Sequence, residues 1–155
     1  LAWFLSIHTM VFGSSFFSLK MFPVIFYFLI AFAVYRLCLQ LSFNKKGALF
    51  CSLNFLIIPA ASLSSFLIST DLLLLLFWTL AMTKLLEIRD NQSTIKFFLF
   101  GLYVGLAFLS KYAGVYFLLS FIILLTLDKK TFEVFYKNFV GLTVFVLLFM
   151  IIILF

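Results

Sequence analysis

Charged residues are scarce in this chain of 155 residues, which has 11 lysines and arginines and 5 aspartates and glutamates. They make up 10% of the sequence, whereas a typical soluble domain has about 25%. So few charges cannot cover a water-soluble surface, and a soluble globular protein is therefore excluded. The net charge of +6 does not indicate nucleic-acid binding, because the sequence has no basic face and no basic patch interleaved with aromatic residues.

Cysteine and histidine are also scarce. Cys38 and Cys51 lie inside apolar runs with no CxxC or Cys/His spacing, so we expect neither a disulfide nor a metal site. His8 is the sole histidine, and on a short apolar segment we expect it to be a packing or interfacial residue. Walker, dinucleotide-binding, nucleophile-elbow and zincin motifs are absent. The sequence thus indicates no cofactor and leaves a divalent metal open.

Apolar residues make up 66% of the chain and come in long runs, which indicates an integral membrane protein. We predict an all-α, polytopic bundle of about six crossings with short junctions, forming a single transmembrane domain over residues 1–155. The first apolar segment, Leu1–Phe12, is too short to span. The expected crossings are Phe22–Leu41, Gly47–Ile68, Leu72–Leu86, Phe97–Ser110, Tyr112–Leu127 and Val140–Phe155, and the expected polar turns or loops are Phe43–Lys46, Glu87–Lys96 and Asp128–Asn138.

The run from 97 to 127 can be read as one helix or as two. As one helix of 31 residues it would be about 46 Å long, whereas the hydrocarbon core is about 30 Å thick. One helix would also leave Lys111 near the middle of the membrane. We therefore predict two short helices that meet at Lys111. Gly101 and Gly105 form a G-x-x-x-G in the first of them, which indicates close packing inside a bundle.

The basic residues fall unevenly about these crossings. If the crossings alternate, one side receives nine of the eleven basic residues, and the positive-inside rule makes that side the cytoplasm. The outer side then holds three charged residues, Lys20, Asp71 and Lys111, each in a tight junction. The nine cytoplasmic residues are Arg36, Lys45, Lys46, Lys84, Arg89, Lys96, Lys129, Lys130 and Lys137.

Two of these junctions each allow a structural and a functional interpretation. Ser69-Thr70-Asp71 precedes an apolar run, so it suits a helix N-cap, but ionisable groups at this depth are also candidates for a functional site. In Leu109-Ser110-Lys111-Tyr112, the lysine either reaches for lipid headgroups or binds a phosphate of a lipid-linked substrate. The sequence leaves both pairs of alternatives open.

Four segments, in this order and spacing, resemble the polytopic GT-C glycosyltransferases. The similarity is to the bacterial relatives of dolichyl-phosphate-mannose-protein mannosyltransferases, to the aminoarabinose transferases of lipid A and to the Rgt-type lipopolysaccharide sugar transferases. Two positions depart from the family pattern, with Leu73 in place of a proline and Lys20 in place of an arginine. The segments are Leu1–Lys20 (LAWFLSIHTMVFGSSFFSLK), Leu56–Ala60 (LIIPA), Ile68–Leu80 (ISTDLLLLLFWTL) and Gly101–Tyr112 (GLYVGLAFLSKY).

The resemblance implies transfer of a sugar from a polyprenyl-phosphate donor to a lipid, glycan or protein acceptor at the outer face of a bacterial plasma membrane. Lys111 and Lys20 would bind the donor phosphate, Asp71 would orient substrate or lysine, and Tyr112 would join Lys111 as a substrate-binding residue. In this family an acidic residue in the first outer loop serves as the base. That loop would precede Leu1, so we expect an inactive fragment that lacks the first helix, the loop and the base. A transporter or a non-enzymatic membrane subunit remains the alternative.

The topology can be checked by cysteine labelling at positions 45, 90 and 130. All three lie on the predicted cytoplasmic side, so reagents that cannot cross the membrane should fail to label them from outside. Labelling of position 130 from outside would contradict the division of the 97–127 run into two helices.

Overall fold

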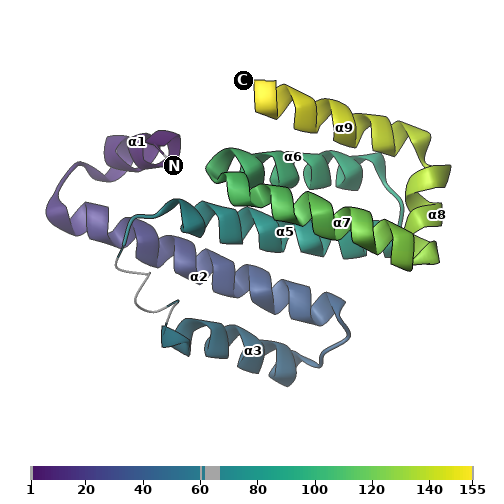
Figure 1. Ribbon diagram of the computed structural model, residues 1–155. Coiled ribbons are helices and arrows are strands. Elements are labelled where there is room, and N and C mark those ends of the chain that lie inside the picture. The colour runs from purple at the N-terminus through teal and green to yellow at the C-terminus, as the bar shows by residue number, and fades with distance from the viewer. Residues whose placement is uncertain (1, 60, 62–66, 155) are drawn as a thin grey trace. The chain divides into compact units, whose positions relative to one another are not determined.

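The computed structural model describes residues 2–59, 61 and 67–154, and this part of the chain consists of helices and short connections (Figure 1). The all-α class is confirmed. The chain divides into two compact units, Leu1–Leu76 and Phe77–Phe155, and the boundary falls inside one helix, α5. The described elements are α1 (Ala2–Phe12), α2 (Phe16–Gln40), α3 (Lys45–Ile57), α5 (Thr70–Asp90), α6 (Thr94–Ser110), the 3-10 turn η1 (Tyr112–Gly114), α7 (Val115–Leu127), α8 (Lys129–Lys137) and α9 (Phe139–Leu154).

In the first unit, α1 folds back onto α2. Gly13 takes φ +76°, a conformation that glycine adopts without steric cost, and the Ser15 side chain then caps α2 by accepting the Ser18 N–H at 3.2 Å. His8 Nε2 donates to the Ser18 carbonyl oxygen at 2.9 Å, and its ring packs edge-on against Phe22 at 5.3 Å. The packing role that we predicted for His8 is confirmed.

A second turn in the first unit joins α2 to α3. Ser42 has φ 67°, and Asn44 caps α3 by accepting the Gly47 N–H on its side-chain oxygen at 2.7 Å. Tyr27 of α2 stacks on Phe55 of α3 at 6.1 Å, as expected for two helices that fold back on each other. The described part of α3 ends at Ile57, whereas the sequence predicted a run to Ile68; residues 60 and 62–66 of that run lie outside the described part.

The second unit is built on a reversal of the chain at Lys111. Phe100 of α6 and Phe121 of α7 are 21 residues apart, which in one continuous helix would separate them by about 32 Å. Their ring centroids are 5.3 Å apart, so α7 must fold back beside α6. The two short helices that we predicted are confirmed as helices.

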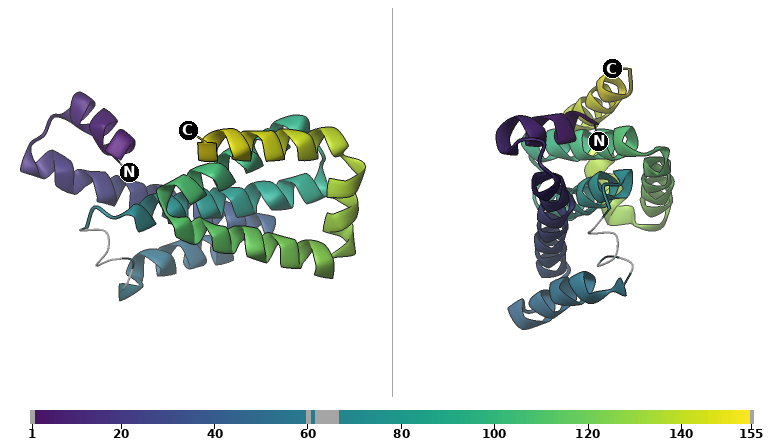
Figure 2. Two further views of the ribbon diagram at one scale, coloured as in Figure 1. Left: turned by 45° about the horizontal axis from the view of Figure 1, so that its top comes forward. Right: turned by 90° about the vertical axis from the view of Figure 1, so that its left-hand side faces the viewer.

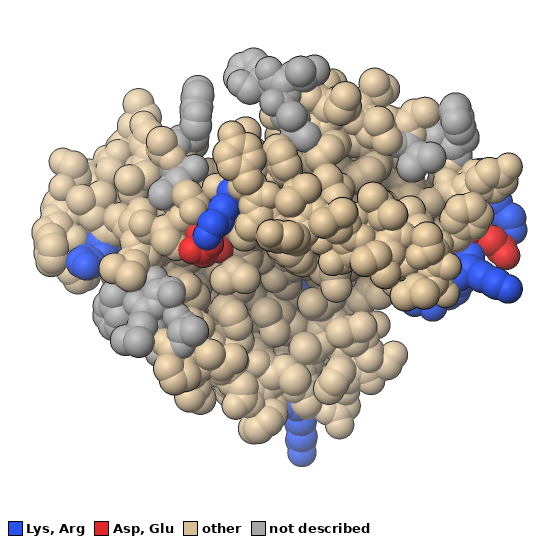
Figure 3. All heavy atoms as spheres, viewed as in Figure 1, with Lys and Arg blue, Asp and Glu red and all other residues tan. Residues whose placement is uncertain are grey.

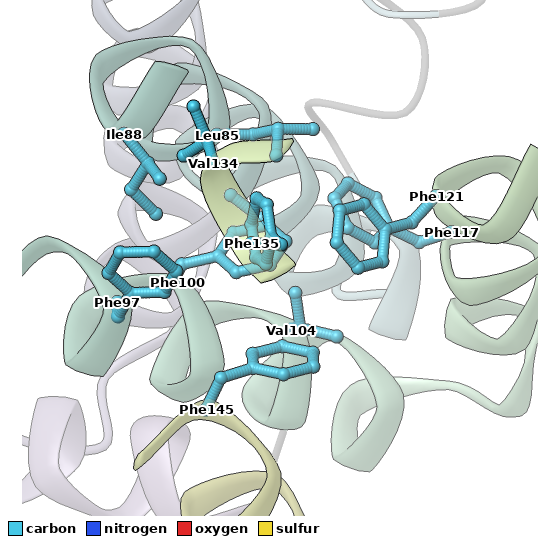
Figure 4. Packing of buried hydrophobic residues seen from close by; sticks show 11 residues of the cluster. Leu85, Ile88, Phe97, Phe100, Val104, Phe117, Phe121, Val134, Phe135 and Phe145 are labelled. Carbon is cyan, nitrogen blue, oxygen red and sulfur yellow. The ribbon is translucent and has the colours of Figure 1, made fainter. Parts of the chain in front are cut away.

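Phenylalanine rings form the core between these helices. Phe97 and Phe100 are fully buried, and Phe135 of α8 inserts between the α6 and α7 rings, 5.1 Å from Phe97 and 5.0 Å from Phe121 (Figure 4). These pairs meet edge to face, the arrangement that the charge distribution of aromatic rings favours. Leu85 from the second half of α5 joins the same cluster.

Glycines set the distance between α6 and α9. A Cβ on Gly101 would lie 3.0 Å from the Phe145 carbonyl oxygen and 3.1 Å from its Cα, and one on Gly105 would lie 2.7 Å from the Ile152 side chain. The close packing predicted from the G-x-x-x-G spacing is confirmed. Positions 101 and 105 meet 145 and 152 in the same order, so α6 and α9 run parallel.

Two predicted loops were wrong or too long. The segment Asp128–Asn138 contains the helix α8, because Thr131, Val134 and Phe135 are spaced to bury one helical face in the core. The loop predicted at Glu87–Lys96 shrinks to the three residues between α5 and α6, because the buried Ile88 extends α5 to Asp90. In both segments the charged residues obscured an apolar helical spacing.

The number of membrane crossings stays a prediction. Within the described residues, one helix, α2 with 25 residues, is long and apolar enough to cross a bilayer. The pair formed by Tyr112–Leu127 and α8 would add a second, but a bend of 102° separates its two parts. The helix α6 has 17 residues, slightly fewer than the ~20 that a perpendicular crossing needs.

Replacing Gly101 with valine should destabilise the second unit. The added atoms would meet backbone atoms of α9 that cannot move without displacing the helix. The expected cost is about 1–3 kcal/mol of unfolding free energy, larger than the modest gain in helix propensity. Thermal unfolding of the purified protein in detergent measures it.

Leu109→Val introduces the same residue at an exposed position of the same helix and should leave the melting temperature nearly unchanged. Equal melting temperatures for the two variants would show that α6 and α9 do not pack as closely at Gly101 as the structure has them.

Candidate functional site

Lys111 lies where α6 ends, with an extended backbone (φ −160°, ψ 137°). Its N–H donates to the Ala107 carbonyl at 3.2 Å, and its own carbonyl accepts the Gly114 N–H at 2.9 Å. The backbone is therefore held on both sides while the side chain is exposed. Tyr112 is 83% exposed and sets its ring edge-on to Phe108 at 5.9 Å. The junction thus presents an ammonium and a phenol on consecutive residues.

Gly114 closes this junction. A Cβ at this position would lie 2.7 Å from the Phe108 Cα and 2.8 Å from its nitrogen, and both are backbone atoms that cannot yield. The turn η1 therefore packs directly on the last turn of α6, which only a glycine allows. The sequence analysis assigned Gly114 no role, although a glycine three residues after the predicted break was a usable signal.

At the opposite end of the second unit, α5 ends, α6 begins and α8 crosses (Figure 2). Basic side chains gather at this end (Figure 3). Arg89 pairs with Asp128 at 3.4 Å and Lys130 with Asp90 at 3.8 Å. Lys96 Nζ donates to the Asn91 carbonyl at 3.0 Å. We call this region the basic end; it comprises Arg89, Lys96, Lys129, Lys130 and Lys137.

Lys111 and the basic end are separated by the length of α6. Its 17 residues correspond to about 25 Å. Five of the nine residues that we assigned to the cytoplasm thus lie together in the second unit, and Lys111 lies away from them. This separation supports the predicted sidedness within this unit.

Asp71 lies in the first turn of α5 and is half-buried. A carboxylate is favoured there, because the helix dipole and the free N–H groups place positive charge at the N-terminus. Leu72 and Leu73, which follow it, are fully buried and anchor the turn. The position agrees with both interpretations of Ser69-Thr70-Asp71, the cap and the functional site.

Lys20 lines an open apolar hollow of about 280 Å³ in the first unit. Its ammonium lies 5.6 Å from the centre of the Phe16 ring, within the range of a cation–π contact. The other lining residues are Leu19 and, across from α2, Leu67 and Ile68. We call this the Lys20 hollow. Ile68, which forms part of its wall, precedes Asp71 by three positions in the chain.

The structure thus builds two candidate sites, one in each unit. The first unit holds Lys20, its hollow and Asp71, and the second holds Lys111 with Tyr112. The clustering of Lys20, Asp71 and Lys111 at one face stays a prediction. Sequence reasoning missed the apolar wall around Lys20, because its two halves come from segments almost fifty residues apart. Within the described residues no group of three or more His, Cys, Asp or Glu could hold a metal ion.

The model of one protein family, dolichyl-phosphate-mannose-protein mannosyltransferase, matches residues 1–155. The chain belongs to this family. The resemblance drawn from the four sequence segments is therefore confirmed. No curated protein and no solved structure matches the chain.

Membership in the mannosyltransferase family indicates the general activity. Members are membrane proteins, and the family points to a glycosyltransferase that uses a lipid-linked sugar donor and an acceptor. This membership does not indicate a transporter or a non-enzymatic subunit, which were the alternatives that the sequence left open.

The predicted clustering can be tested by cross-linking. In a chain with Cys38 and Cys51 replaced by serine, Asp71→Cys and Lys111→Cys together should be joined by a short thiol-specific cross-linker, because alternation puts both at the outer face. Gel mobility after proteolysis between the two positions reports the link.

The matched control pairs Asp71→Cys with Lys129→Cys, which the topology places on opposite faces and which should not react. If single labelling shows that positions 71 and 111 are both reactive but the pair never cross-links, the predicted cluster does not exist.

Proposed function

We propose that this protein is a membrane glycosyltransferase that moves a sugar from a polyprenyl-phosphate donor to a lipid, glycan or protein acceptor at the outer face of a bacterial plasma membrane. The observation that carries the proposal is the family match over residues 1–155. The segment Gly101–Tyr112, one of the four that carry the resemblance, ends with the exposed Lys111 and Tyr112 between two helices.

The chemistry requires a cation beside the donor phosphate. An acceptor hydroxyl or amine loses its proton to a base and attacks the anomeric carbon, the bond from that carbon to the phosphate oxygen breaks, and the lipid phosphate leaves with the electron pair. A positioned cation stabilises the charge that develops on that oxygen. Lys111 is assigned this role, because its exposed side chain extends from a backbone held by two hydrogen bonds, at a junction that the predicted topology assigns to the outer face.

Lys20 is assigned to the lipid side of the donor. A polyprenyl phosphate joins an anionic group to a long apolar chain, and the Lys20 hollow offers an ammonium beside an apolar wall of Phe16, Leu67 and Ile68. Asp71, which follows this wall in the same unit, would orient the substrate or a lysine. Tyr112 would contact the substrate beside Lys111. No catalytic base is assigned to residues of this chain.

The proposed arrangement has six membrane crossings. The clustering of basic residues at one end of the second unit supports it, since the cytoplasmic side carries the excess of lysine and arginine. Helices of 13–17 residues are shorter than a usual crossing, so their ends would lie below the membrane surface. Lys111 would then be drawn into a recess at the outer face.

Replacing Lys111 with methionine keeps the apolar stem and removes the charge. Sugar transfer by the full-length protein from a defined polyprenyl-phosphate donor should fall by roughly 10²-fold or more, the scale found on removal of one electrostatic stabiliser. Lys46→Met is the matched control, because Lys46 is an exposed lysine that the topology assigns to the opposite face. Full transfer by Lys111→Met would refute the role of Lys111.

Asp71→Asn separates the two interpretations of Asp71. Asp71 lies in the first turn of α5, where loss of its charge costs only about 0.3–1 kcal/mol through the helix dipole, so a purely structural residue should tolerate the change. We expect normal expression and melting temperature together with reduced transfer. Unchanged transfer would assign Asp71 to the helix terminus alone.

A further inference from the structure

The backbone conformation of Gly114 does not itself require a glycine. Its φ of −54° and ψ of −21° are right-handed helical values that any residue adopts. The position requires space instead, since an added Cβ would lie 2.7 Å from the Phe108 Cα, 2.8 Å from the Phe108 nitrogen and 3.0 Å from the Ala107 carbonyl carbon. The absence of a side chain therefore serves the contact between η1 and the last turn of α6.

The α6 side of this contact is held in place from behind. The three atoms belong to the helix backbone, and the Phe108 ring packs edge-on against Phe149 of α9 with centroids 6.0 Å apart. Phe149 in turn stacks on the buried Phe145 at 6.3 Å. A larger residue at position 114 would therefore displace η1 rather than α6. The turn would have to move outward by about 0.7 Å to restore ordinary van der Waals contact.

Lys111 is tied to this turn by its backbone. Its carbonyl accepts the Gly114 N–H at 2.9 Å, and its own N–H donates to the Ala107 carbonyl oxygen at 3.2 Å. Lys111 is extended, with φ −160°, whereas the chain is helical immediately before and after it. The direction in which its side chain leaves the backbone therefore depends on where η1 lies against α6.

We propose that Gly114 is a positioning residue for sugar transfer, which fixes the origin of the Lys111 side chain by letting η1 close on α6. The proposal rests on the role that the proposed function gives to Lys111. The lysine stem is long and flexible, so the place of its ammonium depends on a fixed starting point at Cα. A misplacement of about 1 Å can cost on the order of 10²-fold in rate. One added methyl group displaces the turn by less, and the expected loss is about tenfold.

A glycine that only supports packing predicts a different result. Gly101, ten residues before Lys111, also faces backbone atoms, since an added Cβ would lie 3.0 Å from the Phe145 carbonyl oxygen and 3.1 Å from its Cα. Gly101→Ala therefore adds the same methyl group against backbone in the same unit, but away from the junction. If both glycines served packing alone, transfer would fall in both alanine variants in proportion to their loss of melting temperature.

The first experiment measures amide hydrogen exchange of the purified chain by mass spectrometry. In the unaltered chain the Lys111 and Gly114 amides should be protected about tenfold or more relative to an unstructured peptide of the same sequence, because both donate hydrogen bonds within the junction. Gly114→Ala should accelerate exchange at positions 111 and 114, and Gly101→Ala should not. Unprotected amides in the unaltered chain, a result that needs no variant to fold, would overturn the proposal. Equal acceleration by the two variants would also overturn it.

The second experiment is a double-mutant cycle on transfer by the full-length protein from a defined polyprenyl-phosphate donor. Gly114→Ala should lower transfer about tenfold, and Lys111→Met should lower it by roughly 10²-fold or more. The double variant should be no slower than Lys111→Met, because displacing the junction has no further effect once the ammonium is gone. Gly101→Ala is the matched control, and its smaller effect should add to that of Lys111→Met.

The cycle separates the role of Gly114 from that of Lys111. Full transfer by Gly114→Ala would overturn the positioning role and leave Lys111 its own. A double variant about tenfold slower than Lys111→Met would do the same, because independent effects multiply. Full transfer by Lys111→Met would instead refute the proposed role of Lys111, and the positioning role would fall with it.

Discussion

The reversal of the chain at Lys111 is the constraint on which the second unit depends. It requires an extended residue between two helices and a glycine at 114, because any larger residue would collide with the Phe108 backbone. Once α7 folds back beside α6, the rings of Phe100 and Phe121 meet and α8 can insert Phe135 between the helices. The return of α8 then brings α9 parallel to α6. A continuous helix through Lys111 would abolish the whole aromatic core.

The same reversal determines where charge lies. It carries Lys111 about 25 Å away from the basic end, so one unit presents an exposed lysine junction at one end and a network of ion pairs at the other. The network consists of exposed or partly exposed pairs, which contribute little stability individually. Its importance is positional, since it holds the bend at Asp128 and with it the direction of α8. The lysine junction is held instead by backbone hydrogen bonds and tight packing, and the Lys111 side chain is exposed there.

Family membership and the geometry bear on different questions. The match to the dolichyl-phosphate-mannose-protein mannosyltransferase family indicates the class of reaction. The geometry adds the means by which two lysines could reach a lipid phosphate: Lys111 from a fixed turn, and Lys20 from the rim of an apolar hollow.

The sequence by itself determined the helical class, the break at Lys111 and the close packing at Gly101 and Gly105, because each follows from local composition or spacing along one helix. The four segments that resemble the family could also be recognised from the sequence, since each is short and contiguous. Residues 129–137 carry an amphipathic helical spacing that their charged residues obscured, and only the tertiary structure decided that this helix packs Phe135 into the core beside Phe97 and Phe121. The Lys20 hollow likewise needs two segments far apart in sequence. Contacts between distant segments depend on how the helices pack, and no single stretch of residues encodes them.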